Sequence, residues 1–152
     1  MGLGMAMFSF FTRKAAPAKK HDEHKGPLVA IIEDEQDLAQ ILKFAFEAEG
    51  FSVMTAPNGE IGLAMVRDRK PAIILLDIKM PRMNGYQVLA TLHQDPSLAP
   101  VPVIVMTSVA SEENITDEEW AKRLGVARFL SKPFLPEAIV KAVREVLAEK
   151  AD

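Results

Sequence analysis

The stretch 71-PAIILLDIKMPRMNG-85 decides the fold. Four apolar residues, Ile73–Leu76, run directly into the carboxylate of Asp77, and a proline and an Asn-Gly pair come after it. Short, uniformly apolar runs are typical of strands that are covered on both faces of a parallel sheet. Because an acid is costly inside such a layer, its place at the strand's end marks an edge of the sheet where polar groups gather.

The rest of the chain repeats this unit. Further strands are predicted at 28–32, 51–56, 101–107 and 128–131, and segments with helical periodicity separate them. The first helix places its apolar residues on one face: Leu38, Ile41, Leu42, Ala45 and Phe46. The last helix, at about 135–149, likewise has one apolar face, formed by Leu135, Ile139, Ala142, Val143 and Val146. Five strand–helix units predict an α/β fold, a doubly wound parallel sheet with right-handed crossovers.

The composition of the chain argues against several classes of function. The 152 residues carry a formal net charge of -3, which argues against direct nucleic-acid binding, since that favours a basic face. The chain has no cysteine, which excludes disulfides and thiolate metal sites and fits a reducing, cytoplasmic location. No apolar run reaches the roughly 18 residues that a membrane-spanning helix needs.

Residues 1–27 differ in composition from the rest of the chain and are expected to form a flexible tail before a folded domain at 28–150. The alternative is a weak membrane or partner contact through the tail's aromatic and basic residues, Phe8, Phe10, Phe11, Arg13, Lys14, Lys19 and Lys20. We favour the tail, because one short segment of this kind binds a membrane only marginally. We expect no output domain after the last helix.

Polar residues stand where the strands end. Glu33 and Asp34 follow the first strand, Asp77 ends the third, Thr107 ends the fourth and Lys132 follows the fifth. In a parallel sheet these ends share one edge, where ligands bind. Two carboxylates about 5 Å apart repel by roughly 3 kcal/mol at an effective dielectric constant of about 20, so three of them call for a cation.

The ligand set at this edge is all oxygen, which favours Mg²⁺. Lys132 offers a point charge to a phosphate, Thr107 offers a hydroxyl, and Asp77 is the carboxylate placed to attack phosphorus. Taken singly, an acid after a strand is often a helix N-cap, a role open to Asp34, and a lone lysine is often solvated. The joint placement of these residues favours a phosphoryl site.

These residues resemble the receiver domain of bacterial two-component response regulators. The similarity rests on 30-AIIEDE-35, 75-LLDIKMPRMNG-85, 103-VIVMTS-108 and 129-FLSKPF-134. It implies a flavodoxin-like sheet of strand order 2-1-3-4-5 and a cis bond before Pro133. It also implies site roles: Asp77 as phosphoacceptor, Mg²⁺ on Glu33, Asp34, Asp77 and the backbone carbonyl of Lys79, and a catalytic and switch role for Thr107 beside the catalytic Lys132.

The resemblance also implies partners. A histidine kinase or phosphotransfer protein would supply the phosphoryl group, and a protein reader would bind the face formed by the helix around Trp120, strand 128–131 and the last helix. The protein would act as a monomer or a phosphorylation-dependent dimer, and not as an enzyme on other substrates. Phe129 stands at the switch position, where a tyrosine hydroxyl is common, and the stretch from Thr107 to Lys132 is longer than usual, with a capping-box pattern at Thr116–Glu119.

Rival functions find less support. An aspartate-nucleophile phosphatase resembles this pattern but would place a second Asp two residues after Asp77, where Lys79 stands. A dinucleotide-binding domain would carry G-x-G-x-x-G after the first strand, and none is present. The remaining alternative is a pseudo-receiver, an interaction module of the same fold that never takes up phosphate.

Overall fold

The structure, a computed structural model, describes residues 26–108 and 114–151. The tail expected at 1–27 therefore lies outside the described residues, except for Gly26 and Pro27. Among the described residues, no helix is long and apolar enough to cross a membrane.

The core of the fold is a five-stranded parallel sheet of order β2-β1-β3-β4-β5, as predicted. The strands are β1 (Leu28–Ile32), β2 (Ser52–Ala56), β3 (Ile73–Asp77), β4 (Val103–Thr107) and β5 (Arg128–Ser131). The helices are α2 (Gln36–Ala48), α3 (Gly59–Asp68), α4 (Gly85–Gln94), α5 (Asp117–Leu124) and α6 (Pro136–Ala151). They alternate with the strands along the chain, which confirms the predicted α/β class.

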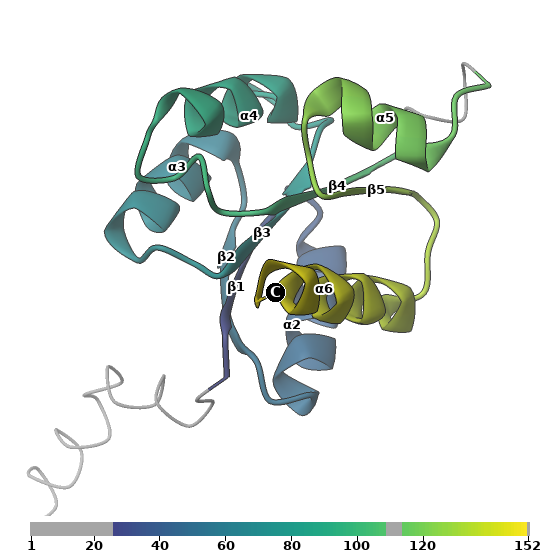
Figure 1. The fold of residues 1–152 in the computed structure, drawn as a ribbon. Coiled ribbons are helices and arrows are strands. Elements are labelled where there is room, and N and C mark those ends of the chain that lie inside the picture. Colours follow the sequence, from purple (N-terminus) through teal and green to yellow (C-terminus); the bar gives the residue numbers. More distant parts are fainter. Residues whose placement is uncertain (1–25, 109–113, 152) are drawn as a thin grey trace, which may run out of the picture.

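Helices cover both faces of this sheet (Figure 1). On one face, α3, α4 and α5 pack over a cluster that includes Ile32, Leu76 and Val105. On the other, α2 and α6 pack over a cluster that includes Ile31, Leu75 and Ile104. Successive residues of each central strand thus enter opposite clusters, which explains why these strands are apolar throughout.

The helix ends obey local rules that are visible in the sequence. Asn84 caps α4 through a reciprocal capping box with Gln87, and the Thr116 hydroxyl accepts a hydrogen bond from the Glu119 amide at the start of α5. Gly125 ends α5 with φ of 68°, in the left-handed region where glycine avoids the strain of a Cβ. The late start of α5 agrees with the capping pattern.

Several boundaries and exposures differ from the sequence predictions. Strand β4 begins at Val103, because the preceding Pro102 has no amide hydrogen for the ladder. Ile41 and Leu135, both placed on buried helix faces, are 52% and 71% exposed. Leu135 precedes the first turn of α6, which Pro136 opens, and Ile41 lies at the rim of the α2 face. The N-cap of α2 is Glu35, not Asp34.

Gly85, the first residue of α4, lies close against the end of β3. A Cβ at this position would lie 2.4 Å from the Asp77 carbonyl oxygen and 2.6 Å from the Ile78 Cα, both backbone atoms that cannot rotate away. We expect Gly85→Ala to lower the free energy of unfolding by roughly 2–3 kcal/mol, measured by urea denaturation.

The matched control is Gly50→Ala. No atom lies within 4 Å of the Cβ position there, but φ is +90°, so only backbone strain of about 1 kcal/mol is expected. A loss at Gly85 no larger than that at Gly50 would contradict the close approach.

Candidate functional site

The carboxyl edge of the sheet gathers three carboxylates. Glu33 follows β1, Asp34 comes next, and Asp77 ends β3. Each offers an oxygen atom, and these atoms lie within 4.8 Å of one another. Glu33 and Asp77 are buried, whereas Asp34 is partly exposed. The sequence prediction that these acids meet at one edge is therefore confirmed.

Lys132 supplies the positive charge beside this cluster. Its Nζ donates a hydrogen bond to Glu33 Oε1 at 2.9 Å and lies 3.8 Å from Asp77 Oδ1. Burial alone would lower the pKa of Lys132, but the Glu33 hydrogen bond and the charges of Asp77 and Glu33 raise it above its usual value. The lysine is thus firmly charged and lies between the two buried acids.

Asp77 carries the strongest electrostatic perturbation at the site. Burial first, and then the hydrogen bond and negative charge of Glu33, raise its pKa from 3.8 to about 8, although Lys132 works in the opposite direction. Lys132 therefore only partly offsets the combined effect of burial and Glu33 on the pKa of Asp77. A divalent cation at these oxygens would favour the ionised form of Asp77.

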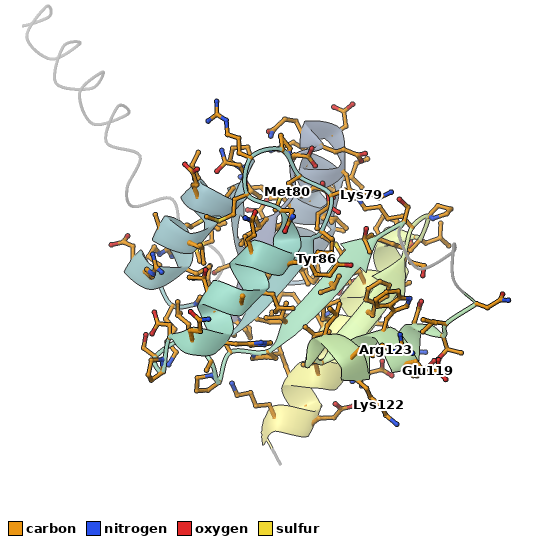
Figure 2. The ribbon with its side chains drawn as sticks, turned by 90° about the horizontal axis from the view of Figure 1, so that it is seen from above. Lys79, Met80, Tyr86, Glu119, Lys122 and Arg123 are labelled. Carbon is orange, nitrogen blue, oxygen red and sulfur yellow. The ribbon has the colours of Figure 1, made fainter. Side chains whose placement is uncertain are left out.

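The remaining predicted residues lie around this cluster. Thr107 ends β4 and is buried, and its carbonyl accepts a hydrogen bond from the Lys132 amide at 2.9 Å. Lys79 lies in the loop that follows Asp77, with its side chain exposed (Figure 2). The peptide bond between Lys132 and Pro133 is cis, as the resemblance implied.

Phe129 is buried in β5 and stacks on Trp120 of α5, with ring centroids 5.7 Å apart and an angle of 17° between the rings. The Ser131 hydroxyl donates a hydrogen bond to Asp117 Oδ1 at 2.6 Å and so joins β5 to the first turn of α5. Sequence reasoning missed this second contact. The sequence gives only a weak indication of this hydrogen bond, namely an acid at a helix start and a hydroxyl just before Lys132.

The fold and the site together define the class of protein. A five-stranded parallel sheet with an acidic cluster and a lysine at its carboxyl edge is the arrangement of receiver domains. Residues 29–144 match the response regulator receiver domain family. The chain belongs to this family of two-component systems.

Individual relatives agree. Protein PilH of Pseudomonas aeruginosa is 36% identical over 120 residues, which cover 79% of this chain and 97% of PilH. The phosphate regulon transcriptional regulatory protein PhoB of the same organism is 29% identical over 122 residues, which cover 80% of this chain but 52% of PhoB. A CheY-like receiver domain protein from Methanospirillum hungatei superposes with a TM-score of 0.73 at 26% identity, over 84% of this chain and 98% of that one.

The raised pKa of Asp77 predicts a pH-dependent cost to stability. The folded state holds this proton to about pH 8 but the unfolded state only to about 3.8, so the folded state binds more protons between these values. Raising the pH through this window therefore destabilises the metal-free protein. We expect the gain in unfolding free energy from Asp77→Asn in EDTA to be about 2–3 kcal/mol larger at pH 7 than at pH 5.

Asp95→Asn is the control for this measurement. Hydrogen bonds from Ser97 hold the pKa of Asp95 below its usual value, so between pH 5 and 8 its stability difference is expected to stay constant. A stability difference for Asp77→Asn that is equally flat would contradict the assignment.

Replacing Lys132 is expected to lower the stability of the folded state, whereas replacing Asp77 is expected to raise it. Removing the cation leaves Glu33 and Asp77 buried without their partner, so Lys132→Met is expected to cost about 3 kcal/mol of unfolding free energy in EDTA. Urea denaturation measures this loss. The exposed Lys122→Met on α5 is the matched control, and equal losses for the two variants would refute the structural role of Lys132.

Proposed function

We propose that this protein is a single-domain response regulator that accepts a phosphoryl group on Asp77 from a histidine kinase or phosphotransfer protein. The observation that carries the proposal is the convergence of Glu33, Asp34 and Asp77 beside Lys132. The similarity to PilH, matched over 97% of its length, supports a role as a receiver.

Mg²⁺ fits the residues present. Three carboxylates offer oxygen ligands to a hard cation, and their mutual repulsion is relieved when one binds. We propose that Glu33, Asp34, Asp77 and the backbone carbonyl of Lys79 hold it. When bound, Mg²⁺ neutralises charge on the transferred phosphoryl group.

The transfer itself needs one bond made and one broken. A carboxylate oxygen of Asp77 attacks phosphorus, and the phosphorus–nitrogen bond of the donor phosphohistidine breaks, leaving imidazole. Lys132 exchanges its contact with Glu33 for one with a phosphate oxygen, because its Nζ already lies 3.8 Å from Asp77 Oδ1. The protein thus phosphorylates itself, and we do not propose an enzymatic activity on other substrates.

We propose that β5 transmits the effect of phosphorylation from the site to a partner-binding surface. The backbone hydrogen bond between Lys132 and Thr107 links the two groups that face the new phosphate. Adjustment of both groups would shift Phe129 and the α5, β5 and α6 surface, so that a protein reader binds one state better than the other.

Intact mass spectrometry after incubation with acetyl phosphate tests this chemistry. We expect one added phosphoryl group that requires both Mg²⁺ and Asp77, with acetate as the leaving group. Asp77→Ala should gain no mass, and Asp95→Ala, which changes a partly exposed acid outside the site, should behave as wild type.

A modified Asp77→Ala variant would place the phosphoryl group elsewhere and contradict the assignment. If the wild-type protein gains no mass, transfer from a panel of phosphorylated histidine kinases is the next assay. Failure there as well would favour the alternative pseudo-receiver that binds partners without phosphate.

A further inference from the structure

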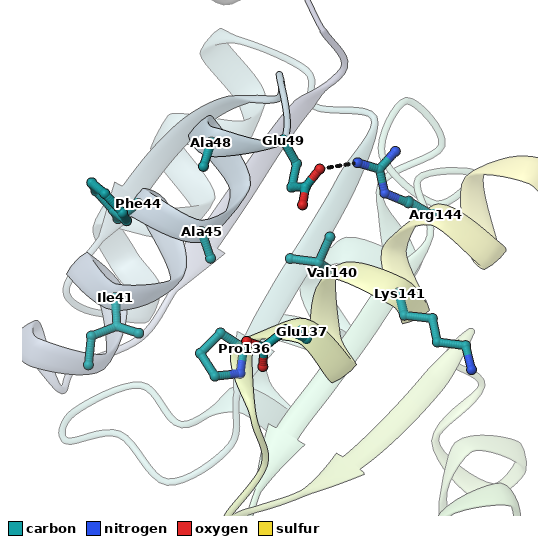
Figure 3. A pocket seen from close by; sticks show the side chains of 10 residues that line it. All are labelled: Ile41, Phe44, Ala45, Ala48, Glu49, Pro136, Glu137, Val140, Lys141 and Arg144. Carbon is teal, nitrogen blue, oxygen red and sulfur yellow. Dashed lines mark hydrogen bonds and ion pairs between the residues drawn. The ribbon is translucent and has the colours of Figure 1, made fainter.

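A groove of about 560 Å³ lies between α2 and α6, on the sheet face opposite α3, α4 and α5 (Figure 3). Its walls are mostly apolar: Ile41, Phe44, Ala45, Ala48, Pro136 and Val140. Phe44 is 78% exposed and Ile41 is 52% exposed, although helix periodicity places Ile41 with buried residues. Two large apolar side chains beside such a groove indicate a surface that another apolar segment covers.

A neighbouring hollow reaches the point where the described chain begins. This second hollow, of about 430 Å³, is lined by Gly26, Pro27, Gly50 and Leu147 among others. The two hollows share Glu49 and Arg144, whose side chains form an ion pair at 2.9 Å. The two adjacent hollows, which meet at this ion pair, are together called the furrow.

The start of the described chain is held firmly at the end of this furrow. Gly26 packs so closely on the turn after α2 that a Cβ there would lie 2.1 Å from the Gly50 carbonyl oxygen. The Pro27 carbonyl accepts a hydrogen bond from the Ser52 amide at 3.1 Å. Whatever precedes Gly26 therefore leaves the domain at a fixed place beside the furrow.

The residues before Gly26 have a composition that matches the groove. The segment 1-MGLGMAMFSFF-11 has no charged side chain and supplies three methionines and three phenylalanines. Methionine adapts to irregular apolar surfaces, and aromatic rings bury large areas. Residues 12–25 connect it to Gly26 and can reach roughly 45 Å when extended, whereas the groove along α2 is only about 10 Å long.

The charges of the connecting residues also fit a path along the end of α2. The connecting residues 12–25 include Arg13, Lys14, Lys19 and Lys20. The last turn of α2 has no basic residue, and Glu47 lies there at the negative end of the helix dipole, beside Glu49, which is paired with Arg144. Basic residues are therefore favoured along this path.

We propose that residues 1–11 occupy the α2–α6 groove of their own chain, as a built-in cover of that surface. Phe44 and Ile41 contact the phenylalanines of the segment, and the basic residues that connect it lie along the end of α2. A partner that uses this face must first displace the segment. The proposal is independent of phosphoryl transfer to Asp77.

Paramagnetic NMR on the full-length chain tests this proposal, and the absence of native cysteine allows a single label. A nitroxide is attached at Ser9→Cys, and amide signals are recorded in dilute solution. Because a short tether keeps the segment at roughly millimolar local concentration, signals of Ala45, Ala48 and Val140 should lose about half their intensity. Signals of α3 and α4, on the other face, should keep theirs.

Phe44→Ser should abolish the loss, whereas Ile61→Ser, which changes an apolar residue on α3 that is 50% exposed, should leave it unchanged. Broadening of isotope-labelled protein by a separate nitroxide-carrying copy would assign the groove to a second molecule and overturn the proposal. The absence of broadening would also overturn the proposal. This includes the case in which the nitroxide-labelled segment binds vesicles of anionic phospholipid instead of the groove.

Discussion

The structure depends on a repulsion that the fold only partly relieves. Parallel strands end at one edge, and there β1 and β3 bring Glu33 and Asp77 into a buried place with Asp34 beside them. Lys132, delivered by β5, is the cation that contacts them. Burial, and after it Glu33, raise the pKa of Asp77 in spite of Lys132, so the metal-free site holds a proton on Asp77. The three closely spaced carboxyl groups suit this edge to bind a divalent cation, which would favour the ionised form of Asp77.

The rest of the fold holds these charges in place. The positions of the acids are fixed because they follow or end β1 and β3, whose residues enter both cores, so this part of the edge cannot spread without disturbing both. The turn after β3 is tied by the Gly85 amide, which donates to the Ile78 carbonyl at 2.8 Å. The edge therefore combines concentrated negative charge with rigid support from the sheet.

Local patterns in the sequence predicted most of the fold and the site. Apolar runs located the strands, the capping pattern at Thr116 marked the start of α5, and the strand ends gave the acids and Lys132. What could not be predicted depends on the distance between elements. Ile41 follows helix periodicity but lies where α2 and α6 leave a groove, and the hydrogen bond of Ser131 to Asp117 joins elements whose approach no local pattern encodes.

The stack of Trp120 on Phe129 has a practical consequence. The chain contains a single tryptophan, and its indole lies against the ring of Phe129 in β5, the residue proposed to shift on phosphorylation. The indole N–H is buried and donates to no acceptor among the described residues. Its emission thus arises from one known location, where a small rotation of Phe129 alters the polarity and quenching that the indole experiences. The domain carries an intrinsic optical probe of its own conformational state.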